Sequence, residues 1–274
     1  MLCSWDKLLA ILPTWIRADV DRFGRQTLQE LRMRINSPPE LVCGCESLFL
    51  NRNIQADDIS FTVNTASKYS PWASASISKG YITATGGHRI GLCGEAVFKD
   101  GKITGMREIH SLNIRVARDF PGIGKQVLSA KGSVLILGAP GWGKTTLLRD
   151  MVRQLAGRYC VAVVDERGEL FPSGIQRGKK MDVLLGAPKS IGVEMVLRTM
   201  GPQWIAVDEI TANEDCTAIL NADGCGTKLI ATAHGNTLED FYKRNGYGKL
   251  VDNKVFETAY ILCSDKTFRM ERMI

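Results

Sequence analysis

Short runs of consecutive apolar residues recur through the second half of the chain. Because these runs lack polar alternation, they predict strands covered on both faces, as in a mostly parallel sheet with helices on each side. Segments with apolar residues at helical spacing, at 145–156 and 190–200, lie between them. The pattern predicts an α/β domain with buried strands at 134–137, 160–164, 205–207, 229–233 and 259–263.

The first half of the chain mixes helical and strand patterns. Apolar residues from Leu2 to Ile16 follow helical spacing and predict a core-facing helix, with a docking or membrane-surface helix as the alternative. A second helix is expected to begin at Asp57. Residues 112–118 alternate apolar and polar side chains, which predicts an outer strand. This half is therefore predicted to be a smaller α+β amino-terminal domain.

Glycines and a turn motif predict a bent hairpin in this first half. Residues 80–98 alternate and are dense in glycine, which suits bent strands and close approach of two backbones. Asp100-Gly101 is a turn signal. Residues 95–103 should therefore form a hairpin.

The length of the chain, 274 residues, suits one large or two modest domains, and 45% hydrophobic content is ordinary for a folded protein. Pro121 to Gly124 form a natural joint. We therefore expect an amino-terminal domain at 1–122 and a second domain at 123–274.

Charge and cysteine usage narrow the classes of function. The net charge of +6 permits anionic partners, but the chain has no long run of Lys and Arg, so nucleic acid is not expected as a partner. The eight cysteines lack the paired spacing of a zinc site, so reduced thiols and no zinc are expected. No apolar run approaches the roughly 18 residues of a membrane span, and no signal-peptide pattern is found. A cytoplasmic location is therefore expected.

A phosphate-binding loop follows the first predicted buried strand. The motif G-x-x-x-x-G-K-[ST] requires a strand before it and a helix after it, and both are predicted here. A glycine-rich turn without nucleotide is the alternative, which the full spacing disfavours. The residues expected to bind the nucleotide are Gly138, Ala139, Pro140, Gly141, Trp142, Gly143, Lys144, Thr145 and Thr146.

The residue types in this loop suit the binding of a nucleoside triphosphate. Its glycines let consecutive N–H groups come close to an anion at the positive end of the following helix. Lys144 adds a mobile cation that can reach the β- and γ-phosphate oxygens. The Thr145 hydroxyl is placed to ligate Mg²⁺. ATP and Mg²⁺ are therefore the expected ligands.

Two carboxylates end a later buried strand. Asp208 and Glu209 directly follow the apolar run at 205–207, as in a Walker B motif. Asp208 is expected to hold Mg²⁺ through water, and Glu209 to polarise the water that attacks the γ-phosphate. Capping of the next helix is the alternative, which the phosphate loop in the expected order disfavours.

Polar residues also end two other buried strands. Glu166 and Glu169 follow the run at 160–164, and one of them is expected near the Mg²⁺ shell or the attacking water. A surface pair between Arg167 and Glu169 remains an equal alternative. His234 ends another apolar run, at a place where a polar residue can sense the γ-phosphate.

Arginines could complete the site from a neighbouring subunit, or from the amino-terminal domain swinging on the joint. Arg115 and Arg118 rank highest because they lie just before the joint, although exposed arginines are usually only solvated. The candidates are Arg89, Arg107, Arg115, Arg118 and Arg198.

This set of motifs resembles the type II/IV secretion ATPase superfamily, whose members carry a Walker A loop, an acidic box, a Walker B motif with glutamate, and a histidine box in this order. The glycine-rich residues 86–94, the pattern at 112–118 and the run at 143–150 resemble a narrower branch, the stage III sporulation protein AA ATPases of endospore-forming bacteria. The resemblance covers most of the chain.

The resemblance implies a RecA-like P-loop motor domain beside an amino-terminal domain, assembled into a homo-oligomeric, hexameric ring. It also implies an ATPase attached peripherally to the membrane on the mother-cell side, with membrane-embedded components of a sporulation channel complex as partners. The roles it carries over are phosphate and Mg²⁺ binding for Lys144 and Thr145, acid/base catalysis for Glu209, the acidic box for Glu166 or Glu169, and the histidine box for His234.

The chain departs from the superfamily pattern at two points. Ile210-Thr211 follows the Walker B glutamate where Ile-Arg is usual, so an arginine role at that position is missing. The four-cysteine zinc insertions of some secretion ATPases are missing too.

Two other functions stay open at this point. A RecA-like, ATP-gated nucleic-acid-binding protein is allowed by the net charge and by Lys179-Lys180, although no stacking surface of aromatic and basic residues is visible. A small-molecule kinase is weaker, because no acceptor pocket is evident. Salt-dependent binding to single-stranded nucleic acid would favour the nucleic-acid-binding function. Phosphate release that is stimulated by an added metabolite would favour the kinase. Nucleotide-dependent binding to a membrane-protein tail would favour the motor.

Overall fold

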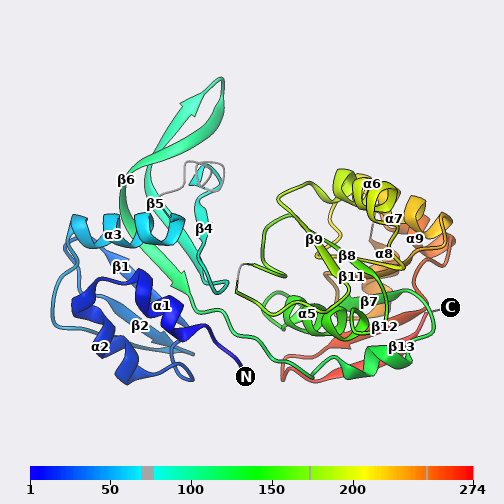
Figure 1. Ribbon diagram of the computed structural model, residues 1–274, viewed down its shortest axis with the longest axis horizontal. Coiled ribbons are helices and arrows are strands. Elements are labelled where there is room, and N and C mark those ends of the chain that lie inside the picture. Colours follow the sequence, from blue (N-terminus) through cyan, green and yellow to red (C-terminus); the bar gives the residue numbers. More distant parts are fainter. Residues whose placement is uncertain (69–76, 173, 245, 274) are drawn as a thin grey trace. The chain divides into compact units, whose positions relative to one another are not determined.

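The computed structural model describes residues 1–68, 77–172, 174–244 and 246–273 (Figure 1). The chain divides into two compact units, each with its own hydrophobic core. The first comprises Met1–Asp119 with Pro172–Ile175, and the second Phe120–Phe171 with Gln176–Ile274. The chain first passes from one unit to the other between Asp119 and Phe120. The domain boundary that we expected between residues 122 and 123 remains a prediction.

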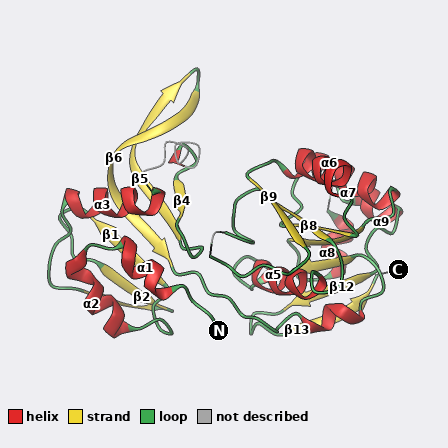
Figure 2. Cartoon of the chain, in the orientation of Figure 1, coloured by secondary structure: helices red, strands yellow, loops and turns green. Residues whose placement is uncertain are grey.

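The first unit contains a six-stranded antiparallel sheet in the order β3-β2-β1-β6-β5-β4. Figure 2 shows strands of this unit in yellow and its helices in red. The prediction of an outer strand at 112–118 is wrong, because β6 lies between β1 and β5. Alternating apolar and polar residues indicate a strand with one buried and one solvated face. In an antiparallel sheet an interior strand shows this pattern as clearly as an edge strand does. The strands are β1 (Glu30–Arg34), β2 (Glu40–Cys43), β3 (Glu46–Phe49), β4 (Tyr81–Thr83), β5 (Arg89–Lys99) and β6 (Lys102–Arg115).

Three helices bury their apolar stripes in the same core as one face of this sheet: α1 (Trp5–Ile11), α2 (Thr14–Phe23) and α3 (Ala56–Ser67). The apolar stripe of the first segment does face the core, with Leu8 and Ile16 fully buried. The single helix predicted there is nevertheless two helices. Pro13 separates them, because proline lacks the N–H that a helix interior needs.

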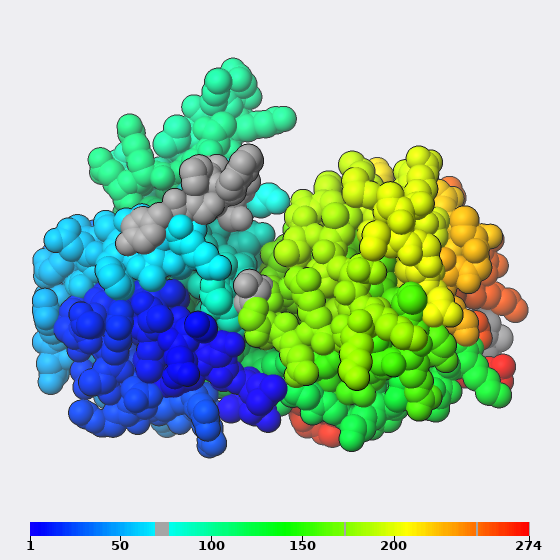
Figure 3. All heavy atoms as spheres, in the orientation of Figure 1, coloured from blue at the N-terminus to red at the C-terminus, as the bar shows by residue number. Residues whose placement is uncertain are grey.

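Strands β5 and β6 form the predicted hairpin. Asp100 and Gly101 both have positive φ, at 50° and 73°, as a tight hairpin turn with Asp-Gly requires. The register shifts between Cys93 and Glu95 and again between Val97 and Phe98, so the strands are bent by bulges. The outer part of this hairpin, hereafter the arm (residues 95–107), extends beyond the other strands of its sheet (Figures 1 and 3).

The second unit contains a seven-stranded sheet in the order β13-β12-β7-β11-β10-β8-β9, parallel except for the antiparallel pairing of β13. All five apolar runs are strands of this sheet, so the α/β prediction is confirmed. The strands are β7 (Val134–Leu137), β8 (Val161–Asp165), β9 (Met181–Leu185), β10 (Trp204–Val207), β11 (Lys228–Ala233), β12 (Thr258–Leu262) and β13 (Phe268–Arg272).

Strands β9 and β13 were not predicted, because they are the two edges of the sheet and are only partly buried. Among the described residues, no helix has both the length and the apolar composition needed to cross a membrane. The helical elements of this unit are a short 3₁₀ helix (Lys125–Ser129), α5 (Lys144–Leu155), α6 (Lys189–Met200), α7 (Asn213–Gly224), α8 (Leu238–Lys243) and α9 (Gly248–Asp252).

The order of the strands determines which loops meet. Strand β11 lies between β7 and β10, and all three run in parallel. The carboxyl ends of these strands therefore lie side by side at one edge of the sheet, where open α/β sheets bind their ligands. The phosphate loop, Asp208 and His234 follow these three ends.

Candidate active site

The phosphate loop connects the fully buried strand β7 to helix α5, which begins at Lys144. Gly141 and Gly143 adopt positive φ values of 76° and 98°, a conformation that other residues rarely adopt. The first N–H groups of α5 have no partner within the helix, and they carry the positive end of the helix dipole. The loop is therefore shaped to receive an anion.

Lys144 folds back across this loop. Its Nζ donates to the carbonyl oxygens of Gly138 at 2.8 Å and Ala139 at 3.1 Å, and lies 3.3 Å from Nδ1 of His234. The side chain is largely buried, and burial lowers the pKa of the Lys144 ammonium, while the carboxylates of Glu209 and Asp208 raise it. The loop thus holds a cation that can exchange carbonyl partners for phosphate oxygens.

Thr145 and Asp208 join the loop to the neighbouring acidic strand end. The Thr145 hydroxyl donates to Oδ2 of Asp208 at 3.0 Å. The other oxygen, Oδ1, accepts from the hydroxyl of Thr232 at 2.7 Å. The two residues predicted to hold Mg²⁺ are therefore in contact.

His234 bridges Lys144 and Glu209. Its Nε2 lies 2.7 Å from Oε1 of Glu209, and its Nδ1 faces the Lys144 ammonium. An ammonium can only donate, so Nδ1 accepts and the ring proton of the neutral histidine is assigned to Nε2, which donates to Glu209. The histidine links the phosphate-binding lysine to the predicted catalytic carboxylate.

Glu209 has a strained backbone, with φ of 43°. A non-glycine residue in this region costs of order 1–3 kcal/mol, and such strain clusters at functional sites. Two main-chain hydrogen bonds to Thr232 stabilise this strained conformation. Glu209 N–H donates to Oγ1 of Thr232, and Ile210 N–H donates to its carbonyl oxygen, both at 2.8 Å. Arg167 lies 3.5 Å from Oε2 of Glu209.

Thr232 positions both acidic residues, a role that the sequence analysis did not predict. It is fully buried, and one hydroxyl fixes both acidic residues, since it donates to Asp208 and accepts from Glu209 N–H. A hydroxyl next to the end of an otherwise apolar strand, two residues before His234, was the available signal.

The acidic residues at and after the end of β8, Asp165, Glu166 and Glu169, make different contacts. Asp165 is buried, and its carboxylate accepts from the N–H groups of Glu169, Leu170 and Phe171, all at 2.9 Å. Burial raises the pKa of Asp165, while these three hydrogen bonds lower it. Asp165 therefore shapes the turn after β8, and the N–H of Glu169 is one of the groups that it fixes.

Glu166 forms an ion pair with Lys189, at 2.8 Å, at the start of α6. Lys189 is largely buried and also lies 3.7 Å from Asp215, whose carboxylate accepts from the N–H groups of Thr211 and Ala212 before α7. Glu166, Arg167, Asp208 and Glu209 line one small cleft together with Asp165 and Lys189. Roles of Glu166 and Glu169 toward a nucleotide remain predictions, and no sequence signal pointed to Lys189.

An apolar cavity adjoins the phosphate loop. It encloses about 560 Å³ and reaches Gly141, Gly143 and Thr146 of the loop and helix start. Its walls include Trp142 from the loop and Phe268 from β13. The lining side chains that carry polar groups are Thr146, Lys266 and the indole of Trp142. Its volume and composition suit a planar, largely apolar group.

The candidate arginines have partners within their own units. Arg198 pairs with Glu194 on α6. Arg107 pairs with Glu95, Arg115 with Glu30, and Arg89 stacks on Tyr81. Arg118 donates to the carbonyl oxygens of Gln26 and Leu28. A role for any of them at a nucleotide remains a prediction.

The donor set fits a Mg²⁺ ion that arrives with a nucleotide. Among residues 1–68, 77–172, 174–244 and 246–273, no group of three or more His, Cys, Asp and Glu could hold a metal by itself. In nucleotide sites Mg²⁺ binds one or two protein oxygens and takes its other ligands from phosphates and water. Thr145 Oγ1 would supply one such oxygen, and Asp208 Oδ2, 3.0 Å away beside the loop, would bind a water of the Mg²⁺ shell.

Replacing Thr232 by valine is expected to lower kcat for ATP hydrolysis by about 10- to 100-fold with little change in the affinity for ATP, because the strained position of Glu209 loses its support. Steady-state kinetics and nucleotide titration measure the two effects. Thr227→Val is the matched control, since Thr227 is also buried but precedes β11 at the opposite end and donates to Pro202. Equal losses in both variants would contradict the positioning role.

The phosphate loop after a central parallel strand, with an acidic pair after a nearby strand, defines a P-loop nucleotide-binding protein with a RecA-like core. The sequence matches the family "Sporulation stage III, protein AA" over residues 6–270. It is 36% identical to the stage III sporulation protein AA of Bacillus subtilis (strain 168) over 272 residues, covering 92% of this chain and 89% of the relative. The chain belongs to the stage III sporulation protein AA family, and the resemblance noted from the motifs is confirmed.

Solved structures support the same fold. The pilus retraction motor PilT, solved with bound ADP, has a TM-score of 0.63 at 13% identity, over 95% of this chain and 78% of that chain. The Legionella pneumophila ATPase DotB has a TM-score of 0.60 at 16% identity, over 95% of this chain and 80% of that chain. At these identities the likeness concerns the fold, and the predicted RecA-like core with a smaller amino-terminal domain is confirmed.

Proposed function

We propose that this chain is a Mg²⁺-dependent ATPase that acts as a homo-oligomeric, hexameric motor of a channel complex in endospore formation. The observation that carries the proposal is the convergence of the phosphate loop and the acidic strand end, through contacts of Thr145 with Asp208 and of Lys144 and Glu209 with His234. The family and the fold shared with PilT and DotB support the same class of activity.

Binding of ATP would exchange the present partners of Lys144. The N–H groups at the start of α5 surround the β-phosphate, and Lys144 turns from the Gly138 and Ala139 carbonyls toward the β- and γ-phosphate oxygens. Thr145 and Asp208 would hold Mg²⁺, and the metal would supply neutralisation of phosphate charge. His234, released from the lysine, is free to report the presence of the γ-phosphate to Glu209.

Glu209 is the proposed base in the hydrolytic step. Its carboxylate orients a water molecule, whose oxygen attacks the γ-phosphorus as the bond to the β-phosphate bridging oxygen breaks, giving ADP and inorganic phosphate. The proton of the water passes to the carboxylate. Thr232 keeps Glu209 in place, and the His234 Nε2–H stabilises the carboxylate by a hydrogen bond.

Helix α5 could transmit the change at the phosphate loop. Asp150, fully buried on this helix, accepts from the N–H groups of Gly122 and Gly124 at 2.9 and 2.7 Å. Arg149 donates to the carbonyl oxygens of Glu169 and Leu170. The joint predicted at Pro121 to Gly124 is thus fastened to the helix that begins at Lys144, so a shift of α5 would pull on the joint and change the domain angle.

The apolar cavity beside the loop is the proposed place of the nucleobase. It begins where the phosphate loop ends, and Trp142 and Phe268 offer aromatic surfaces for stacking. Stacking on an aromatic side chain is worth roughly 1–3 kcal/mol per base.

Trp142→Ala is therefore expected to weaken ATP binding about tenfold while leaving kcat and the affinity for inorganic tripolyphosphate nearly unchanged. Titration calorimetry with both ligands measures the difference. Met270→Ala, on the same strand as Phe268 but well exposed, serves as the control that should leave ATP binding unaltered. An equal loss for tripolyphosphate would assign Trp142 to the phosphate loop rather than to the base.

The partners and the location follow from the same proposal. A motor of this kind works beside membrane-embedded components of the channel complex, so we propose a peripheral, cytoplasmic position on the mother-cell side. An arginine from a neighbouring subunit, or from the amino-terminal domain swinging on the joint, would complete the site.

The oligomer is tested by measuring ATPase turnover per subunit against protein concentration, together with sedimentation in the presence of a non-hydrolysable ATP analogue. We expect turnover to rise with concentration to a plateau, in parallel with assembly. Turnover that is constant in a sample that stays monomeric would defeat the shared site but would leave the ATPase assignment intact.

A further inference from the structure

The arm of the first unit has one apolar and one polar face. Cross-strand partners share a face, and on one face the pairs are apolar: Ala96 with Met106 and Phe98 with Ile103. The other face carries the pairs Lys99 with Lys102 and Val97 with Gly105, and the charged pair Glu95 with Arg107, which at the bulge also lines the groove described below. The arm is therefore an amphipathic ribbon.

The apolar face of the arm is exposed to solvent. Phe98 is 66% exposed and Ile103 46%. A two-stranded hairpin is marginally stable by itself, and contiguous exposed apolar side chains mark sites of interaction. This face is the continuation of the sheet face whose buried residues Leu92 and Leu112 share the core with helices α1, α2 and α3.

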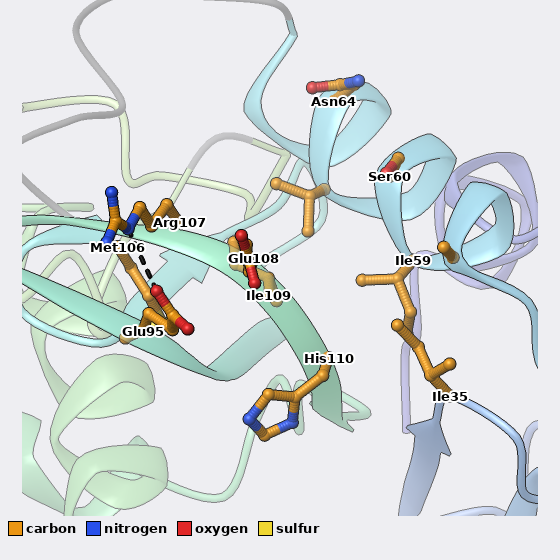
Figure 4. Close-up of a pocket in the computed structure, with 12 residues that line it drawn as sticks. Ile35, Ile59, Ser60, Asn64, Glu95, Met106, Arg107, Glu108, Ile109 and His110 are labelled. Carbon is orange, nitrogen blue, oxygen red and sulfur yellow. Dashed lines mark hydrogen bonds and ion pairs between the residues drawn. The ribbon is translucent and has the colours of Figure 1, made fainter.

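A groove continues this apolar surface at the base of the arm (Figure 4). It encloses about 560 Å³ between helix α3 and strand β6. Met106 lines the groove and also belongs to the apolar face of the arm. The other apolar lining residues include Ile59 and Val63 from α3 and Ile109 from β6. One surface thus runs from Phe98 into the groove, and its side wall is a helix.

A glutamate with a strained backbone, Glu108, lines this groove. Three residues of β6, 108–110, face the single residue Gly94 of β5, where a Cβ would lie 2.7 Å from the carbonyl oxygen of Arg107. Glu108 in this bulge has φ of 47°. Bulges re-aim side chains next to binding sites, and strain of this kind is evidence for a role. The Glu108 carboxylate lies among the lining residues (Figure 4), and no described residue forms a hydrogen bond or an ion pair with it.

We propose that the groove and the apolar face of the arm together bind one amphipathic α-helix of a partner protein, with a lysine or arginine on its flank paired with Glu108. Helices α1, α2 and α3 already bury their apolar sides against this face of the sheet. A partner helix beside α3 would continue that layer over the arm, with apolar residues at helical spacing facing Met106 and Phe98. This binding site goes beyond the proposed hydrolytic function and does not depend on it.

Charge complementarity selects the basic kind of helix. Glu95, Arg107, Glu108 and His110 all line the groove, but Glu95 and Arg107 pair with each other at 3.0 Å, which leaves the Glu108 carboxylate as the charge available to a partner. The whole chain carries a net charge of +6, so a basic peptide is not attracted by the general field of the protein. Preferential binding of a basic peptide would therefore indicate pairing with the Glu108 carboxylate.

The test is a fluorescence anisotropy titration of the full chain with a labelled helical peptide of about 18 residues, five turns, made of leucine at helical spacing and lysine elsewhere. We expect saturable binding that is at least about tenfold tighter than for the same peptide with glutamate in place of lysine. Phe98→Ser and Glu108→Lys should each weaken the lysine peptide by about tenfold or more.

Val97→Ser is the matched control, because Val97 is an exposed apolar residue of the same hairpin on the opposite face. It should leave the affinity within about twofold. The proposal is overturned if the lysine peptide shows no saturable binding, if the glutamate peptide binds equally well, or if Val97→Ser is as damaging as Phe98→Ser. It is also overturned if Phe98→Ser abolishes binding to vesicles of phosphatidylcholine and phosphatidylglycerol in equal amounts but leaves peptide binding unchanged, since the face would then serve a membrane.

Discussion

Replacing Lys144 by alanine is expected to abolish measurable ATP hydrolysis and to weaken ATP binding by at least about 100-fold. The Lys144 ammonium contacts Gly138, Ala139 and His234, at the centre of the phosphate loop. Removing it takes away charge-assisted hydrogen bonds to phosphate, each worth roughly 1.5–3 kcal/mol. Titration with a fluorescent ATP analogue and a phosphate-release assay measure both losses.

Lys228→Ala is the charge-matched control for this experiment. Lys228 begins strand β11, whereas the active site lies at the end of that strand, so the variant should bind and hydrolyse ATP within about twofold of the native protein. ATP affinity that survives Lys144→Ala would contradict the assignment of the phosphate loop.

Glu209→Gln is expected to lower kcat by about 100- to 10,000-fold, the usual contribution of a general base, while ATP binding stays within about threefold. The amide keeps the size of the side chain but cannot accept the proton of the attacking water. Single-turnover hydrolysis and equilibrium binding separate the two quantities. The variant should therefore accumulate the ATP-bound state.

Glu214→Gln provides the control for Glu209, because Glu214 is an exposed carboxylate in the first turn of the following helix α7. It should leave kcat nearly native. Hydrolysis by Glu209→Gln within about fivefold of the native rate would exclude Glu209 as the base and would direct attention to Glu166, which lines the same cleft.

Features set by local sequence were predictable. The phosphate loop depends on glycines at fixed spacing, and Gly141 and Gly143 adopt the positive φ values that this spacing suggests. The continuous apolar runs identified the buried strands, because a strand covered on both faces has no polar alternation. Asp100-Gly101 likewise determined the hairpin that forms the arm.

Features set by contacts between distant residues were not predictable. Strand β6 was interpreted as an outer strand because alternation reports burial on one face and not the number of neighbours. The edge strands β9 and β13 lack a continuous apolar run, because only part of each strand is buried. Pro13, which divides the first helix, was a local signal that the apolar stripe obscured.

The candidate site shows the same division. Asp208, Glu209 and His234 were predicted because each ends an apolar run, and parallel strands bring such ends together. The hydroxyl of Thr232 between the two carboxylates and the pairing of Lys189 with Glu166 depend on residues far apart in the chain. The roles of Asp150 on α5 and of Glu108 in the arm depend on the exact backbone path, which the sequence pattern does not determine.

A crystal structure with Mg²⁺ and a non-hydrolysable ATP analogue shows whether one magnesium triphosphate is held by the loop at 138–145 and by Asp208 and Glu209. We expect the β-phosphate on the N–H groups at the start of α5, the metal beside Thr145 and Asp208, and the γ-phosphate facing Glu209. An empty loop at saturating analogue, or a triphosphate bound elsewhere, would contradict this expectation.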